Sequence, residues 1–263
     1  MTEKIYSEPW ATYHARRATC LTYHALADFN KSPLIYHQKK NGIIADQDRP
    51  AYRIGRATHT MLLEGMARFS DEYVIGGPIN PKTGKTYGAD TKAFSEWMSE
   101  FPGKDVVSEE DYGNIQKMWD SFISHPIAGE FRFAPEVTIR GEYLGHLCQS
   151  RIDGLADDSA YMIELKTCED IDNFVYDARK YKYTRQVAFY REMVRLATGQ
   201  EPIAYIVAVE KKAPHRCGVW NVDATVLNVC KSENEDAMRQ LAECAQTGTW
   251  PSGYESLMQM DEM

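Results

Sequence analysis

The chain has 263 residues, of which 43% are hydrophobic, and this length and composition are ordinary for a globular protein of one large or two small domains. Its formal net charge of -8 at pH 7 excludes a protein that coats nucleic acid through bulk positive charge, so any contact with DNA has to come from local basic clusters. The six cysteines show no C-x-x-C spacing, which argues against the common zinc and iron–sulfur motifs.

The N-terminal part of the chain is predicted to be mainly helical. Residues 21–40 predict two short helices that meet at Ser32 and Pro33, because the residue before a proline avoids the helical conformation. Residues 51–65 predict one helix that is closed by Gly65.

A glycine- and proline-rich loop is predicted at residues 76–91. It contains Gly-Lys-Thr, the end of a phosphate-binding loop, but the position that this motif requires to be glycine is Ile79, so we assign the loop no such function. Residues 108–126 then predict a helix that begins with a capping box at Ser108 and ends at Pro126.

From about residue 135 the hydrophobic period changes to two, which is typical of strands. Three consecutive strands are predicted as an antiparallel meander, at 135–143, 146–156 and 160–167. A single long helix is expected over about 170–198, stopped by Gly199.

The last part of the chain predicts one buried strand and one long helix. The apolar run 203–210 is expected to be covered on both faces, 217–222 fits an edge strand, and 224–248 predicts a helix capped by Gly248. Helices, a strand meander, a crossover helix and a further strand together indicate one α/β domain with a mixed sheet.

Two neighbouring predicted strands carry charged residues although strands of this kind are expected to be buried, and these charges need an explanation. Asp153 lies near the end of one predicted strand and Glu164 in the middle of the next, so a hairpin can bring the two carboxylates together. Paired carboxylates bind Mg²⁺ or Mn²⁺, with the backbone carbonyl of Leu165 as a further oxygen ligand. Lys166 beside them suits metal-assisted hydrolysis of a phosphodiester.

On its own, this pattern also fits a structural Glu-Lys pair on a solvated sheet face. Two features favour a site instead. Gln186 and Tyr190 share a face of the following predicted helix, with Tyr183 one turn before them, and His59 lies on an upstream helix. Glu64, Glu136 and Glu142 are additional acidic candidates.

The segments "GRATH", "SRIDGL", "IELKT" and "YTRQVAFY", in this order, resemble the motifs of the PD-(D/E)XK nuclease superfamily. They are most similar to its exodeoxyribonuclease VIII branch, the RecE C-terminal nuclease domain and its phage relatives. The resemblance implies an α/β, restriction-endonuclease-like core, with a mixed central sheet flanked by helices and extra N-terminal helices. We expect a single nuclease domain over 1–263, divided into a mainly helical part (1–130), the catalytic sheet and crossover helix (131–223), and a C-terminal helix and tail (224–263).

The resemblance also implies an activity, which is Mg²⁺-dependent digestion of double-stranded DNA from the 5' end. Such a reaction leaves a 3' single strand for recombination by annealing. Motif matching assigns metal binding, with Mn²⁺ as a substitute for Mg²⁺, to His59, Asp153 and Glu164. It assigns help to the attacking water to Lys166, and support of the active site to Gln186 and Tyr190.

Basic residues near these motifs are the predicted DNA-binding set, together with one tyrosine: Arg53, Arg56, Arg179, Lys182, Tyr183 and Arg185. The expected partners are double-stranded DNA ends, further copies of the chain in a ring-shaped homo-oligomer, and a single-strand-annealing recombinase. No apolar run is long enough to cross a membrane and no signal peptide is evident, so we expect a cytoplasmic protein in a bacterial or phage-infected cell.

Two alternatives stay open. A catalytically silent DNA-binding or phage accessory protein could keep the fold, although such a protein should have lost part of the acidic and lysine set. An endonuclease of the same superfamily would use the same metal site, and nicking of closed circular DNA would separate it from an exonuclease. We also expect Asp153→Ala to abolish hydrolysis and to relieve carboxylate repulsion in the metal-free protein.

Overall fold

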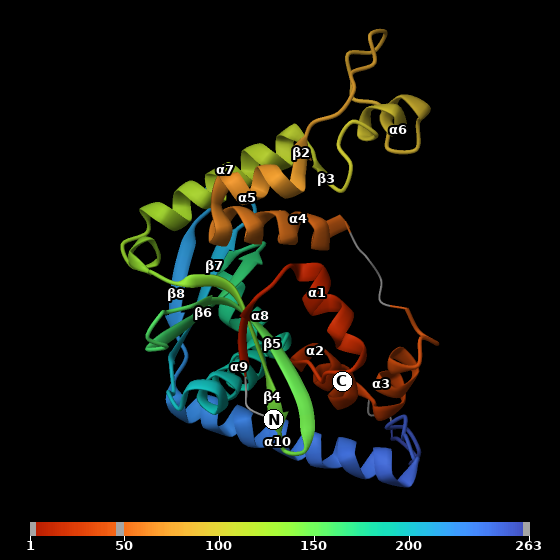
Figure 1. The fold of residues 1–263 in the computed structure, drawn as a ribbon, viewed down its shortest axis with the longest axis vertical. Helices are drawn as coiled ribbons and strands as arrows, with labels where there is room; N and C mark the ends of the chain where they lie inside the picture. Colours follow the sequence, from red (N-terminus) through yellow and green to blue (C-terminus); the bar gives the residue numbers. More distant parts are fainter. Residues whose placement is uncertain (1–3, 46–49, 260–263) are drawn as a thin grey trace.

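Six strands form one mixed sheet at the centre of the molecule, in the order β1-β4-β5-β6-β7-β8 (Figure 1). The computed structural model describes residues 4–45 and 50–259. Neighbouring strands are antiparallel except for β6 and β7, which run parallel and are joined by a helical crossover. The strands are β1 Lys4–Ser7, β4 Ala134–Tyr143, β5 His146–Leu155, β6 Tyr161–Cys168, β7 Ile203–Glu210 and β8 Cys217–Asn221. The predicted α/β class with a mixed central sheet is confirmed.

Helices cover both faces of this sheet. In Figure 1, α4, α5 and α7 lie on one side and α9 and α10 on the other. Consecutive residues of β6 show why both faces are covered, since Met162 packs into one buried hydrophobic cluster and Ile163 into another. The helices are α1 Trp10–Ala15, α2 Tyr23–Lys31, α3 Pro33–Lys40, α4 Pro50–His59, α5 Gly65–Glu72, α6 Lys92–Met98, α7 Glu109–Ser124, α8 Phe174–Lys180, α9 Tyr183–Thr198 and α10 Ala224–Thr247.

Several predicted boundaries are confirmed by capping geometry. Helices α2 and α3 meet at Ser32, whose hydroxyl accepts a hydrogen bond from the backbone N–H of Ile35 at 3.4 Å. Helix α7 begins after Ser108, whose hydroxyl accepts from the N–H of Asp111 at 3.0 Å. Helix α10 ends at Gly248 in the left-handed conformation.

The predicted helix at 51–65 is not uniform. Helix α4 ends at His59, the turn Thr60–Glu64 is a π-helix, and Gly65, the first residue of α5, has φ +84°. A π-helical turn is rare and is found frequently at functional sites. Here it directly follows His59.

The prediction of one helix over 170–198 is wrong. The chain forms a short 3-10 turn (Ile171–Asn173), then α8 and α9, and the break falls at Lys182, which has φ +58°. No glycine or proline marks this break in the sequence. Tyr23 of α2 donates a hydrogen bond from its hydroxyl to the carbonyl of Lys182 at 3.0 Å, so a contact with a distant element holds the bend.

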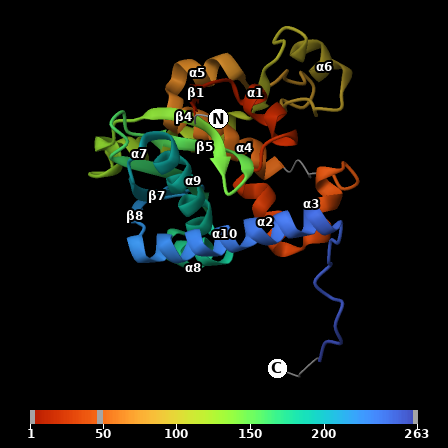
Figure 2. The same ribbon diagram turned by 60° about the horizontal axis from the view of Figure 1, so that its bottom comes forward.

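The chain between α5 and α7 projects from the body of the molecule (Figure 1). It is framed by the short parallel strands β2 Tyr73–Ile75 and β3 Asp105–Val107 and contains α6. The segment 76–91 consists of turns and loop, as predicted. At the other end, Trp250 and Pro251 after α10 pack against α3, and the chain beyond them extends away from the body (Figure 2). Within the described ranges, no helix is long and apolar enough to cross a membrane.

Candidate active site

Strands β5 and β6 separate where the motif residues begin. They pair only at Gly154 with Ile163 and Leu155 with Met162. Beyond the Gly154–Ile163 pair, the backbone N–H of Leu165 on β6 donates to the side chain of Asp153 on β5, with 2.6 Å between the nitrogen and Oδ2. A carboxylate therefore satisfies a buried donor that the neighbouring strand no longer reaches. This hydrogen bond fixes the Asp153 carboxylate at the point where β5 and β6 separate.

Glu164 and Lys166 lie side by side on β6, which is paired with β7 along its whole length. Lys166 Nζ is 2.5 Å from Glu164 Oε1, and the two side chains are 16% and 2% exposed. The second oxygen of Glu164, Oε2, is buried and has no hydrogen-bond partner among the residues that the structure describes. A buried, unsatisfied carboxylate oxygen is costly and points to a missing partner such as a cation.

Three further donors converge beside this pair. His59, Glu136 and Asp153 each offer one ligand atom, and these atoms all lie within 4.8 Å of one another. His59 Nδ1 is 3.7 Å from Asp153 Oδ1. Glu136 stands opposite Asp153, because the strand pairs Pro135–Gly154 and Val137–Ile152 flank this position in the register of β4 and β5.

Of the additional acidic candidates, only Glu136 joins the site. Arg151 on β5 pairs with the Glu136 carboxylate, a contact that the sequence analysis did not anticipate. Glu142 is exposed further along β4, and Glu64 pairs with Arg68 at 3.6 Å. The metal group is thus formed by α4, β4 and β5, and it faces the Glu164–Lys166 pair of β6.

Burial and neighbouring charges set the ionisation of the carboxylates. Burial, with the Asp153 charge adding to it, raises the pKa of Glu164 to about 7 even though Lys166 opposes the shift. Burial also raises the pKa of Glu136, again with Asp153 adding. The pKa of Asp153 is lowered, because His59, Lys166 and the Leu165 N–H together outweigh its burial. Asp153 is therefore the most firmly ionised acid of the group.

Neighbouring carboxylates shift the pKa of the two basic groups upwards. Burial alone would lower the pKa of His59, but Asp153 outweighs it and the pKa is raised. The pKa of Lys166 is also raised, since Glu164 and Asp153 outweigh its burial. Positive and negative groups thus adjoin one another across the site, which offsets part of the cost of burying these ionisable side chains.

The donor set fits a hard divalent cation. Oxygen ligands with one imidazole suit Mg²⁺ or Mn²⁺, whereas no thiolate lies in the group. His59, Glu136 and Asp153 would hold the ion, and the unpartnered oxygen of Glu164 is the next available ligand. Glu164 itself lies outside the 4.8 Å group, and the Leu165 carbonyl as a ligand stays a prediction.

Helix α9 supplies a polar wall to the site. Gln186 Nε2 donates to the Tyr190 hydroxyl at 3.1 Å, and both side chains are buried. Burial raises the pKa of Tyr190, and Glu164 and Asp153 contribute to the same shift. The ring of Tyr183 lies 5.0 Å from Lys166 Nζ in a cation–π contact. The predicted α9 residues are therefore brought to the motif residues.

The predicted DNA-binding residues fall into two places. Arg53 is exposed and Arg56 half-buried on α4, the helix that carries His59. Arg179, Lys182 and Arg185 line a groove between the start of α9 and the start of α10. Arg185 is already paired with Glu233 of α10, at 2.7 Å.

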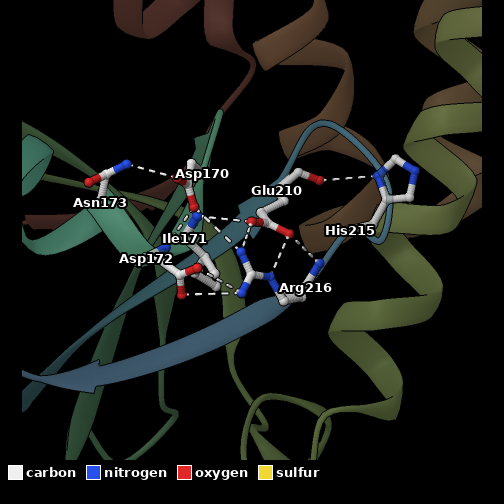
Figure 3. Close-up of polar contacts among 7 residues, drawn as sticks. All are labelled: Asp170, Ile171, Asp172, Asn173, Glu210, His215 and Arg216. Atoms are coloured by element: carbon white, nitrogen blue, oxygen red, sulfur yellow. Dashed lines mark hydrogen bonds and ion pairs between the residues drawn. The ribbon is translucent and has the colours of Figure 1, made fainter.

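The loop that follows β6 is anchored by a network that the sequence analysis missed (Figure 3). Glu210, at the end of β7, accepts hydrogen bonds from the backbone N–H of Ile171 at 2.9 Å and from the side chain of Arg216 at 2.6 and 3.0 Å. Arg216 also pairs with Asp170 and Asp172, at 3.4 and 3.1 Å. The network holds the segment that connects the strand of Lys166 to α8.

Three comparisons with known proteins bear on this geometry. A family model described as a PDDEXK-like domain of unknown function (DUF3799) matches residues 23–260. The crystal structure of a protein from Eubacterium rectale, named a "putative exonuclease", superimposes with a TM-score of 0.68 at 13% identity, over 98% of this chain and 97% of that one. At this identity the likeness shows the fold alone. A search of curated proteins finds no match.

Proposed function

Because the chain belongs to the PDDEXK-like family that its residues 23–260 match, we propose that it is a metal-dependent deoxyribonuclease that degrades double-stranded DNA from its ends. The resemblance of the four sequence motifs to the PD-(D/E)XK superfamily is confirmed at the level of family and fold. The finer features belong to the proposal: Mg²⁺ as the metal, 5'-to-3' polarity, and a 3' single strand as the product for annealing.

The observation that carries the proposal is the unpartnered Oε2 of Glu164, buried beside Lys166 and close to Asp153. A solvated structural Glu-Lys pair would leave the carboxylate in water or fully hydrogen-bonded. Instead, the protein keeps a buried oxygen unsatisfied next to three convergent metal donors. This arrangement is useful for binding a cation and has no evident value for stability.

Each side chain has a definable task in phosphodiester hydrolysis. A bound Mg²⁺ would polarise the phosphate and lower the pKa of the attacking water. Lys166 Nζ lies between the Glu164 carboxylate and the Tyr183 ring, where it can orient a water molecule and stabilise negative charge that develops on the phosphate. The Leu165 N–H orients Asp153 and leaves its Oδ1 facing His59.

Helix α9 would support this machinery rather than react itself. The Gln186–Tyr190 hydrogen bond closes one wall of the site, and the raised pKa keeps the Tyr190 hydroxyl protonated. Tyr190 can then donate its proton to a nearby acceptor but does not add a negative charge. Such positioning lowers the reorganisation that the reaction requires.

The proposal of end-directed digestion draws on two sources. The motifs are most similar to the exodeoxyribonuclease VIII branch, and the structural neighbour from Eubacterium rectale carries the name of an exonuclease. A ring-shaped homo-oligomer and a single-strand-annealing recombinase as partner are part of the same proposal. Light scattering of the purified protein would test the oligomer by its mass.

The test of activity is digestion of linear duplex DNA that is labelled at either the 5' or the 3' end. Wild-type protein with Mg²⁺ or Mn²⁺ should release the 5' label in small products, EDTA should stop the reaction, and Lys166→Ala should lower the rate by at least about 10²-fold. Lys211→Ala is the matched control, since Lys211 pairs with Glu169 at the end of the same strand pair. It should digest DNA like wild type.

Each departure from this result has a defined meaning. Release of the 3' label first would reverse the polarity, and nicking of closed circular DNA would indicate an endonuclease with the same metal site. Absence of cleavage with either metal would contradict the proposed nuclease and favour a catalytically silent DNA-binding protein.

A further inference from the structure

A chain of aromatic contacts leads from the candidate active site to the surface. The ring of Tyr183 lies 5.0 Å from Lys166 Nζ, and it is also stacked with Tyr181, with ring centroids 5.8 Å apart and an interplanar angle of 27°. Tyr183 is half-buried, whereas Tyr181 is 55% exposed. Lys180 Nζ lies 5.3 Å from the centroid of the Tyr181 ring, and because Lys180 is itself exposed, its side chain can move aside for a planar ligand and pair with a phosphate.

This aromatic pair adjoins the groove between α9 and α10. The groove has a volume of about 330 Å³ and runs past the break at Lys182. Its lining also includes hydroxyl and apolar side chains, among them Thr184, Thr225 and Val229. A groove of this volume and composition can hold a short stretch of one extended strand.

The side chains that line the groove carry a net positive charge. Arg179 and Lys182 line it, and neither has a carboxylate partner among the residues that the structure describes. Glu233 is the acidic residue of the lining, and it is already paired with Arg185 at 2.7 Å. On a protein with a formal charge of -8, two unpaired cations at one groove favour an anionic ligand.

We propose that this groove holds a single DNA strand next to the active site, with one unpaired base stacked on Tyr181 and its phosphates beside Arg179 and Lys182. Exposed aromatic rings combined with a basic groove bind single-stranded nucleic acid with little sequence preference. Backbone contacts along a duplex require the cations only, because a base inside the duplex is stacked on both faces by its neighbours and offers none to the ring. The inference deepens the proposed nuclease function, since it names the form of the substrate strand at the site.

The proposal is tested by binding that separates base stacking from phosphate contact. Fluorescence anisotropy would measure the affinity for a labelled 20-nucleotide thymidine strand and for the same strand with abasic sites, in EDTA so that no hydrolysis occurs. Wild type should bind the thymidine strand more tightly than the abasic one. Tyr181→Ala should weaken binding of the thymidine strand by about 5- to 100-fold and change binding of the abasic strand little.

Two further variants control this result. Tyr181→Phe keeps the ring and should bind within about twofold of wild type. Arg179→Gln removes a phosphate contact, so it should weaken both strands equally and reduce the salt dependence of binding. Thermal melts should show that all three variants fold, since both side chains are largely exposed.

The outcomes separate this inference from the proposed activity. Equal affinity of wild type and Tyr181→Ala, equal loss on both strands, or no binding of single strands by wild type would each overturn the strand groove. If wild type digests DNA with Mg²⁺ while Tyr181→Ala binds normally, the inference fails and the nuclease stands. If binding depends on Tyr181 but no DNA is cut, the strand groove stands and the nuclease fails.

Discussion

At the scale of single residues, Asp153 combines a structural and a functional task. Its Oδ2 accepts from the N–H of Leu165, which β5 no longer satisfies, and its Oδ1 faces His59. This changes the expectation that Asp153→Ala would simply relieve carboxylate repulsion. Removal of the carboxylate also leaves a buried N–H without an acceptor.

We therefore predict that Asp153→Ala and Asp153→Asn differ in stability but not in activity. The asparagine variant keeps an oxygen that can accept from Leu165, so its free energy of unfolding should exceed that of the alanine variant by about 1–3 kcal/mol. Both should lose metal-dependent hydrolysis. Urea unfolding in EDTA checks the difference, and equal stability of the two variants would show that the Leu165 hydrogen bond contributes little.

Glu136 allows a matched test of the metal group on one strand. Glu136→Gln should weaken binding of Mn²⁺ about tenfold, because it removes one charged oxygen ligand near His59 and Asp153. Glu142→Gln changes an exposed carboxylate on the same strand and should leave the affinity unchanged. Isothermal titration calorimetry measures both, and the same affinity for both variants would remove Glu136 from the ligand set.

At the scale of elements, the site depends on how the segment after β6 is held. Glu210 lies at the end of β7, its side chain is 5% exposed, and Arg216 of the β7–β8 turn binds both of its oxygens. The Arg216 hydrogen bonds lower the pKa of Glu210 to about 2, and the backbone N–H groups of Ile171 and Arg216 add to the shift. This ion pair fastens the crossover connection to the sheet (Figure 3).

The lowered pKa predicts a pH dependence of stability. Since the ordinary pKa of 4.5 lies above the folded value of about 2, ionised Glu210 stabilises the folded protein above about pH 4.5. That contribution is lost as the pH falls from 4.5 towards 2. The free energy of unfolding of Glu210→Gln should be roughly 2 kcal/mol lower than that of wild type at pH 7. Below pH 4.5 it should fall less steeply than that of wild type, because the variant has no carboxylate to protonate at this position.

Thermal melts of wild type and variant between pH 7 and pH 3 check this prediction. Glu96→Gln serves as the control, because Glu96 forms an exposed ion pair with Lys92. Such a pair contributes little, so this variant should follow the wild-type profile. Parallel profiles for wild type and Glu210→Gln would contradict the assigned role of Glu210.

At the scale of the whole molecule, one sheet separates two buried hydrophobic clusters. Met162 belongs to the cluster under α9 and α10, and Ile163 to the cluster under α4 and α7. The candidate site takes His59 from α4, which packs on one cluster, and Gln186 and Tyr190 from α9, which packs on the other. The site therefore depends on both clusters. The predicted single domain, with its three parts, should therefore unfold as one cooperative unit.

Met162→Ala and Ile163→Ala, which alter opposite faces of β6, test whether the two hydrophobic clusters unfold together. Both side chains are fully buried, so each variant should lose about 2–5 kcal/mol of unfolding free energy. Each should shift one common urea transition, with coincident curves from circular dichroism and tryptophan fluorescence. Two separate transitions, with each variant affecting a different one, would instead indicate two independent domains.

The sequence by itself determined the order of most elements and the motif residues. Period-two and helical patterns are local, as are capping residues such as Ser108 and Gly248, so they can be recognised without the fold. The motif residues His59, Asp153, Glu164, Lys166, Gln186 and Tyr190 were assigned through the resemblance of four short segments to the PD-(D/E)XK motifs.

Only the tertiary structure decided how these residues act on one another. The break at Lys182 depends on a hydrogen bond from Tyr23, and the orientation of Asp153 depends on where β5 and β6 separate. Of the three additional acidic candidates, Glu136 is the one that enters the metal group, through its position across from Asp153, and Tyr181 stacks on Tyr183. Each depends on contacts or pairing that no local pattern records, which is why local patterns could not predict it.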